Sequence, residues 1–439
     1  MKKLLSVIFA VCLAVCSVMV IAACGENGAD TQAGAPITFS YSIVKDGDET
    51  YYSLKNVTVS DKAQALIAKK DFAGLADLFN TDAGEYKAPA VKYTKDTVTT
   101  LVIPEEYNKI AVKAISQDAV SGLAFVKKIV VGDNITKMSE GAFSSLIALE
   151  EIELPFVGGE KNAKNEKKLF GYIFGTTSGD GLTSCEQKYN GGDSGNTKTY
   201  YLPSALKTIT VRGGNEKKDE TLKFKIEEKD GEIKYVYEGE DGYDELDAVE
   251  NSATENTDVY SVAPYSFYNC TTLETINLSG VEEIEEYTFY GCTGIKNLTF
   301  GDDVKTIGAH AYENCTSLKA VDFNNVETIG ESAFAGCTAL GEKYLDGANK
   351  IVFTDIEIGN SAFSGCTAIK DVEFNGECEI GERAFKGCTA IETVDFTNVT
   401  SVGDYAFYGC TNLASITNYD GSISDNHIFE ETEYVKHLK

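Results

Sequence analysis

The sequence predicts an α/β-type solenoid in which short parallel strands from successive turns of the chain lie side by side on a concave face. Three observations favour this fold class: a cysteine that recurs at nearly constant intervals, apolar columns at fixed distances from it, and an alternating apolar pattern after it. The intervals between the recurring cysteines are 22, 23, 22, 29, 22 and 22 residues. These cysteines are Cys270, Cys292, Cys315, Cys337, Cys366, Cys388 and Cys410.

Each recurring cysteine stands within a fixed pattern. Thr follows it, an aromatic residue precedes it by three positions, and Leu or Ile follows it by three positions. Further apolar residues come next, as Ile276 and Leu278 come after Leu273. A period of about 20–29 residues with Leu-x-x-Ile-x-Leu spacing is the signature of leucine-rich repeats. The alternating part predicts a short strand with one buried face.

The same pattern continues upstream of the cysteines with other apolar residues. The paired strand positions are Leu101 and Ile103, Ile129 and Val131, Ile152 and Leu154, and Ile209 and Val211. Because one repeat cannot bury its own apolar face, repeats must stack, and we expect about ten rungs between roughly residues 90 and 418. The residue before each cysteine is Gly or Asn, which predicts a turn with positive φ there.

The interruptions of the repeat define the predicted domain organisation. We expect a small N-terminal α+β unit with a strand at ITFSYSIV and a helix around residues 62–79, covering the open end of the stack. The sequences TLKFKIEE and EIKYVYE predict a β-hairpin within a long insertion. The predicted segments are a signal peptide (1–23), a tether (24–36), an N-terminal capping unit (37–90), leucine-rich repeats (91–154), an insertion with one embedded repeat (155–265), leucine-rich repeats (266–418) and a C-terminal cap (419–439).

The N-terminus has the pattern of an export signal. Lys2 and Lys3 precede an uncharged apolar run over residues 4–23, which closes with Ile-Ala-Ala before Cys24. This ending resembles the lipobox of bacterial lipoproteins, and the resemblance implies that Cys24 is lipidated and becomes the new N-terminus. The alternative is an uncleaved membrane helix, because about 20 apolar residues can span a bilayer.

The net charge excludes one class of partner. The formal charge is −29, and it becomes −31 without residues 1–23, which contain two Lys and no acid. Nucleic acid binding depends on Lys and Arg that neutralise phosphates, so we expect no nucleic acid partner and contact with a membrane only through the lipid anchor.

The repeat AFxGCTxIxxVxF resembles the BspA-like, or Treponema-type, leucine-rich repeat family. The stretches LVIPEEY (101–107) and YYLPS (200–204) also resemble segments of that family. The resemblance implies a secreted or surface-attached protein, and several members are adhesins for host matrix proteins or other microbes. It transfers no binding residue to this chain.

The sequence indicates no metal site, cofactor or catalytic set. The ladder cysteines have no Cys-x-x-Cys spacing and no neighbouring His, so we expect small buried side chains rather than zinc ligands or cross-links. Cys185 and Cys378 fall outside the ladder and are expected to be exposed. The three histidines, His310, His427 and His437, form no recognisable triad with Ser or Cys.

The candidate binding site consists of the residues that alternate with the buried strand positions and therefore face outward. These are Thr275, Asn277, Asn297, Thr299, Asp322, Asn324, Asp371, Glu373, Asn375, Thr393 and Asp395. A regular array of short polar groups suits an extended partner, although exposed strand residues are polar in many proteins. The insertion adds an aromatic group that could be a binding hot spot or could pack the insertion onto the solenoid: Phe170, Tyr172, Phe174, Tyr200 and Tyr201.

These observations predict a non-catalytic, lipid-anchored protein on the outer side of the membrane, exposed at the cell surface, which binds host or microbial surface proteins. Two alternatives stay open. One is a glycan-binding lipoprotein that works with uptake machinery, and the other is a hydrolase housed in residues 155–265.

Overall fold

The computed structural model describes residues 36–47, 49–81, 93–107, 109–189, 196–213, 224–229, 232–237, 260–342, 351–397, 399–419 and 427–433. The predicted signal peptide and Cys24 lie outside the described residues.

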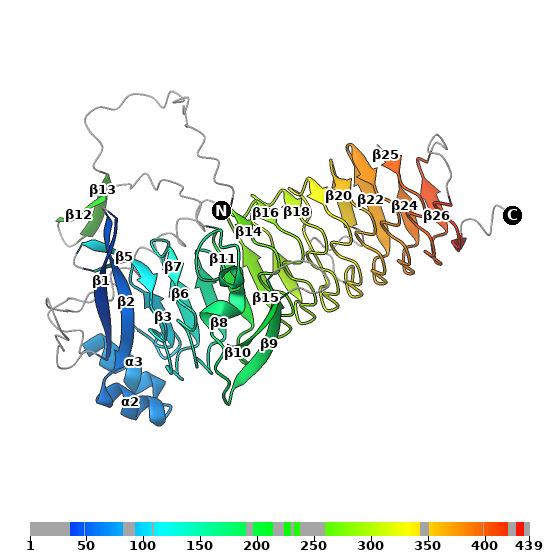
Figure 1. The fold of residues 1–439 in the computed structure, drawn as a ribbon. Helices are drawn as coiled ribbons and strands as arrows, with labels where there is room; N and C mark the ends of the chain where they lie inside the picture. Colours follow the sequence, from blue (N-terminus) through cyan, green and yellow to red (C-terminus); the bar gives the residue numbers. More distant parts are fainter. Residues whose placement is uncertain are drawn as a thin grey trace.

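Short parallel strands form a first ladder along the length of the molecule (Figure 1). One sheet contains β3 (Thr100–Ile103), β6 (Lys128–Val131), β8 (Glu151–Leu154), β11 (Thr208–Val211), β15 (Thr275–Leu278) and β17 (Asn297–Thr299). A second sheet continues it with β20 (Ile351–Thr354), β22 (Asp371–Asn375), β24 (Thr393–Asp395) and β26 (Ser415–Thr417). Ile209 of β11 is in register with Ile152 and with Ile276. The predicted solenoid of parallel strands is therefore confirmed, with the embedded repeat between its neighbours.

The two sheets of the first ladder are separated at one rung. Residues 320–323 form no strand, and only a bridge between Asn297 and Ala320 connects this rung to β17. The rung nevertheless keeps its core contact, because Phe323 is buried.

A second ladder consists of very short parallel strands, which mostly follow the first-ladder strands by a few residues in the chain, as β16 (Glu283–Ile284) follows β15. It contains β14 (Ser261–Val262), β16, β18 (Thr306–Ile307), β19 (Thr328–Ile329), β21 (Glu357–Ile358), β23 (Cys378–Ile380) and β25 (Val399–Val402). The sequence analysis did not predict this ladder, since most of these strands have two residues and show no periodicity.

From Phe267 onward, the core of the solenoid contains a continuous column of stacked rings, one from each rung. Neighbouring ring centroids in this column are 4.7 to 6.0 Å apart. We call this set the ring column: Phe267, Phe289, Tyr312, Phe334, Phe363, Phe385, Phe407 and Phe429. All its members are buried. The aromatic residue three positions before each cysteine therefore joins each rung to the next through ring stacking.

Turns connect the second ladder of one rung to the first ladder of the next. The α-helices of the described residues lie in the N-terminal unit. The predicted positive φ before each cysteine is confirmed, for example at Asn269 (58°) and Asn314 (63°). A second position of each rung, which the sequence did not reveal, also has positive φ, as at Tyr287 (55°) and His310 (58°). Two left-handed residues in one short segment prevent a helix there.

The N-terminal unit joins a β-sheet to two helices. Its sheet contains β1 (Ile37–Asp46), β2 (Glu49–Val59), β4 (Glu106–Tyr107), β5 (Ile110–Ile115) and β7 (Lys137–Met138). β2 pairs in parallel with β5, so the unit is continuous with the solenoid. The single helix expected over residues 62–79 is in fact two, α2 (Asp61–Ala68) and α3 (Phe72–Thr81), because Lys70 has a φ of 55°.

The insertion contains both predicted features, an embedded rung and a hairpin. Two 3₁₀ helices, η1 (Glu166–Lys168) and η2 (Phe170–Ile173), precede the antiparallel pair β9 (Leu182–Lys188) and β10 (Thr197–Pro203). The chain then enters β11 of the first ladder. The predicted hairpin is confirmed as β12 (Phe224–Lys229) and β13 (Glu232–Tyr237).

The described part of the predicted C-terminal cap continues the repeat. Phe429 follows Phe407 by 22 residues and stacks on it at 6.0 Å. Thr432 occupies the cysteine position of this half-rung and is buried. His427, within the predicted C-terminal cap, stacks on Tyr405.

Tyr312 should weaken the ring column, because its hydroxyl is buried without a hydrogen-bond partner. We expect Tyr312→Phe to raise the free energy of unfolding by about 1–3 kcal/mol. The matched change Phe334→Tyr, one rung further on, should lower it, since it buries a new hydroxyl in the same column. Urea unfolding midpoints of the two variants measure both effects. Destabilisation by Tyr312→Phe would mean that the hydroxyl has a partner.

Candidate functional site

The eleven residues of the predicted binding site all lie outside the core, and we call them the polar face. Each is exposed or half-buried. Nine of them belong to β15, β17, β22 and β24. The other two, Asp322 and Asn324, belong to the rung without a strand. Strand alternation positions them, since buried and outward residues follow one another in β15 and β22.

Rung-to-rung register brings the polar face into columns. In the N-terminal group, Thr275 is in register with Asn297, and Asn277 with Thr299. In the C-terminal group, Asp371 is in register with Thr393, and Glu373 with Asp395. The side chains also bond across rungs: Asn297 Nδ2 donates to Thr275 Oγ1 at 3.4 Å, and Thr393 Oγ1 donates to Asp371. The structure thus forms two polar groups, with Asp322 and Asn324 on the rung between the two sheets.

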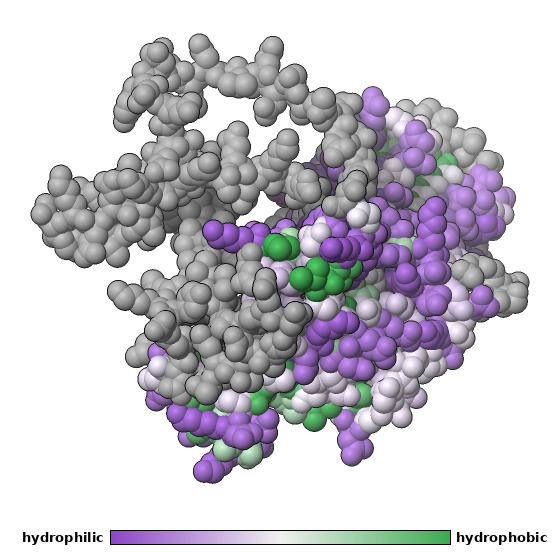
Figure 2. Space-filling model, turned by 60° about the vertical axis from the view of Figure 1, so that its left-hand side comes forward, coloured by the Kyte–Doolittle hydropathy of each residue, from purple (hydrophilic) through white to green (hydrophobic). Residues whose placement is uncertain are grey.

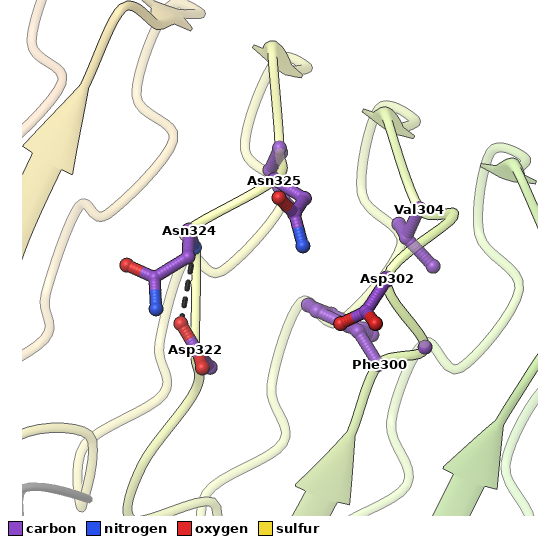
Figure 3. Close-up of a pocket in the computed structure, with 8 residues that line it drawn as sticks. Phe300, Asp302, Val304, Asp322, Asn324 and Asn325 are labelled. Carbon is purple, nitrogen blue, oxygen red and sulfur yellow. Dashed lines mark hydrogen bonds between the residues drawn. The ribbon is translucent and has the colours of Figure 1, made fainter. Parts of the chain in front are cut away.

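A shallow pocket lies at the separation of the two sheets (Figure 3). The space in it that water can occupy is only about 40 Å³, and its lining residues are Phe300, Gly301, Asp302, Val304, Asp322, Asn324, Asn325 and Val326. Asp302 and Asp322 come from neighbouring rungs, and the Asn324 amide donates to Asp322 Oδ1 at 3.0 Å. Sequence analysis missed Asp302 and Asn325 because they follow the strand positions, in turns.

The charges of the first ladder differ between its two ends. Towards the N-terminal end, the Lys128 ammonium lies 2.7 Å from the Glu151 carboxylate and 3.7 Å from the Glu153 carboxylate. The negative charges of these two residues are therefore partly neutralised. Towards the C-terminal end, the polar face carries the carboxylates of Asp322, Asp371, Glu373 and Asp395. The described surface seen from the N-terminal end is mainly hydrophilic, with a few small hydrophobic groups (Figure 2).

Asp395 has a structural role as well as an outward position. Its carboxylate accepts hydrogen bonds from the Thr397 amide at 3.0 Å and from Asn418 Nδ2 at 2.6 Å. Partial burial alone would raise the pKa of Asp395, but the hydrogen bonds from Asn418 and Thr397 outweigh burial and lower this pKa. Asp395 therefore holds the turn after β24 and is a poor position for a binding test.

The aromatic residues of the insertion pack it onto the solenoid. Phe170, Phe174 and Tyr200 are buried, and Tyr172 and Tyr201 are half-buried. The Phe170 ring lies 4.9 Å from Phe267, so the insertion extends the ring column by one rung. The interpretation of this group as a hot spot is wrong for the buried residues, because a partner cannot reach them.

The ladder cysteines are buried hydrogen-bond donors. In six of the seven, the thiol donates to the carbonyl of the ring-column residue in the preceding rung, at 3.0 to 3.3 Å. These donors are Cys292, Cys315, Cys337, Cys366, Cys388 and Cys410. A cysteine suits the position because its small side chain fills the core and also satisfies a buried carbonyl.

The expectation that Cys185 and Cys378 are exposed is wrong. Cys378 belongs to β23 of the second ladder and is fully buried. Cys185 lies in β9, which packs against the rung of Cys270, and only 6% of it is exposed. All nine cysteines of the described residues are free and buried.

Within the described ranges, no group of three or more His, Cys, Asp or Glu side chains could hold a metal ion. Among the same residues, no helix is long and apolar enough to cross a membrane.

The stacked parallel strands and the polar face define a repeat solenoid of the leucine-rich class. The family model for the BspA type leucine rich repeat region matches residues 92–170, 247–352 and 347–439 in six copies. The chain belongs to this family, as its repeat indicated. The matched residues include the half-rung at 427–433, which the sequence analysis had assigned to the cap.

Solved structures of leucine-rich repeat proteins are also similar to this chain. A T. pallidum leucine-rich repeat protein is 22% identical over 40% of this chain and 78% of its own, with a TM-score of 0.25. A Bacteroides ovatus leucine-rich repeat protein is 16% identical over 90% and 97%, with a TM-score of 0.25. The pneumococcal vaccine antigen PcpA is 13% identical over 94% and 98%, with a TM-score of 0.23. A search of curated proteins found no match.

The buried thiols should make stability fall at high pH. Burial raises the pKa of Cys388 well above its ordinary value and that of Cys410 to about 12. An unfolded thiol has a pKa of about 8.5. The pKa of each buried thiol is higher in the folded protein than in the unfolded chain. The contribution of the thiol to the free energy of unfolding is therefore complete below about pH 8.5, and it is lost as pH rises towards the folded pKa. In that range, each such thiol should lower the free energy of unfolding by about 1.4 kcal/mol per pH unit.

Urea midpoints between pH 8 and 10 measure this loss, and Cys388→Ala is the matched control. This variant should be less stable at pH 8, and its stability should fall less steeply with pH because it has one buried thiol fewer. Equal slopes for the two proteins would show that the thiols do not cause the loss.

Proposed function

We propose that this protein is a non-catalytic, lipid-anchored binding protein of the cell surface, and that the polar face binds a protein of the host or of another microbe. The observation that carries the proposal is the polar face itself. Its eleven polar side chains form two groups that are each in register between neighbouring rungs, with Asp322 and Asn324 between the groups, and all of them are accessible. Such a repeated surface fits a partner that extends along several rungs.

The charge of the polar face supports a partner with Lys or Arg at its contact surface. Asp322, Asp371 and Glu373 lie within three neighbouring rungs, and the chain carries a formal net charge of −29. Opposite charges speed the encounter and disfavour acidic partners. A neutral glycan could donate hydrogen bonds to these carboxylates, but it would gain no attraction between opposite charges.

The lipobox supports an anchor at Cys24, followed by a polar tether. Two or three acyl chains hold a protein stably, whereas a single chain does not. Replacement of Cys24 by Ser should release the protein from the membrane fraction, or leave it there as an uncleaved precursor. Cleaved, membrane-bound Cys24→Ser protein would contradict the anchor.

The binding role can be tested with a soluble form that begins at residue 30. It is first used to capture partners from extracts of host matrix and of bacterial surfaces, and the dissociation constant of each captured protein is then measured. We expect the triple variant Asp322→Lys, Asp371→Lys, Glu373→Lys to weaken binding by about tenfold or more, because opposed charges become like charges.

A matched control carries the same charge change on another face. Glu331, Glu357 and Glu379 are exposed acids of the same region, and two of them belong to the second ladder. Their replacement by Lys should leave binding within about twofold. Equal losses for both triple variants, or unchanged binding for both, would show that the polar face is not the binding surface. Competition by neutral oligosaccharides would favour a glycan partner instead.

A further inference from the structure

Cys270 differs from the other cysteines of the ladder. In the six later rungs the thiol donates to a carbonyl of the preceding rung. The Cys270 Sγ instead lies 3.6 Å from the Sγ of Cys185, a residue that is 85 positions away in the sequence. Two thiols therefore meet at the place where the insertion joins the cysteine ladder.

The surroundings hold these two sulfurs against each other. Gln187, two residues after Cys185 on β9, is fully buried, and its Nε2 donates to the Ser266 carbonyl at 2.9 Å. The Gln187 Oε1 accepts from the Gly171 amide at 2.7 Å. The contact between Phe170 and Phe267 adds an apolar clamp on the same rung. Gln187 Nε2 also lies 3.5 Å from Cys270 Sγ. β9 is thus fixed on the rung of Cys270 by Gln187 and by the contact between Phe170 and Phe267.

From this geometry we propose that Cys185 and Cys270 are a site of reversible disulfide formation that fastens the insertion to the repeat ladder. The other ladder thiols donate to carbonyls of the preceding rung and face no second thiol at this distance. Cys185 Sγ lies 3.4 Å from the Asn269 carbonyl, but it also lies 3.6 Å from Cys270 Sγ. Thiols in contact require only a local rotation to reach bonding distance. The cross-link is independent of the polar face and of any partner that binds there.

The chemistry requires a disulfide donor, RS–SR, as the oxidant. Cys185 is the more exposed of the two, and its thiolate attacks one sulfur of the donor, which releases RS⁻ and forms a mixed disulfide. The Cys270 sulfur then attacks the Cys185 sulfur and releases the second RS⁻. The two protons lost by the cysteines end on two RSH molecules. The protein is oxidised by two electrons and the donor is reduced by two. Donors of this kind persist in extracytoplasmic compartments.

The cross-link would close a loop that includes β10, β11 and the β12–β13 hairpin. A bond across a loop of this length restricts the unfolded chain and therefore stabilises the folded one. We expect oxidation to raise the thermal unfolding midpoint by roughly 5 °C.

The test uses the full chain, reduced with dithiothreitol and then incubated with oxidised glutathione. After unfolding in the presence of an alkylating reagent, non-reducing peptide mapping should show the Cys185 peptide joined to the Cys270 peptide. The other seven cysteines of the described region should be alkylated. Absence of the joined peptide, or Cys270 joined to Cys292, would overturn the proposal.

Variants connect the bond to its effect. Cys185→Ser should abolish the rise in the thermal midpoint on oxidation, and Cys378→Ser, which removes another buried thiol, should retain it. Because Cys185 lies at the edge of the core, its serine variant is the one expected to fold. A rise that persists in Cys185→Ser would contradict the assignment, as would its absence in the wild-type protein.

Discussion

The structure depends on contacts that repeat from one rung to the next in the dry interior. Rings of the ring column stack on one another at 4.7 to 6.0 Å. Beside them, the ladder thiols from Cys292 onward donate to carbonyls of the preceding rung. A single rung has no other rung to contact, so it has no stability of its own. The spacing of parallel strands, about 4.8 Å, matches the spacing of stacked rings, and this match allows both to continue over many rungs.

The interior also decides what the surface presents. Because alternate strand residues are fixed in the core, the residues between them point outward at the same spacing, and the polar face inherits the regularity of the ring column. The insertion obeys the same constraint: it supplies Phe170 to the column and β11 to the first ladder. The solenoid therefore accommodates an insertion that itself supplies a core ring and a strand in register with the neighbouring rungs.

The sequence was sufficient to predict the features that depend on residue type. The parallel strands, the positive φ at Asn269 and Asn314, and the outward position of residues such as Thr299 all followed from spacing and alternation. The second ladder could not be predicted, because two-residue strands such as β16 have no period. The second left-handed position, as at Tyr287 and His310, changes its residue type from rung to rung, so no column of Gly or Asn revealed it.

The positions of Cys185 and Cys378 were mispredicted for a related reason. Their burial comes from contacts between segments that are distant in the sequence, and spacing within one repeat cannot show such contacts. The outward position of the polar face, by contrast, depends only on alternation within one strand, so the sequence was sufficient to predict it.

Distances between spin labels would test the in-register stack most directly. The threonines after the cysteines are exposed and share one column, so labels at Thr271 and at Thr316, Thr367 or Thr411 are separated by two, four or six rungs. We expect the measured distance to increase by about 10 Å for every two rungs. Distances that do not grow with the number of rungs would contradict the solenoid and everything inferred from its surface.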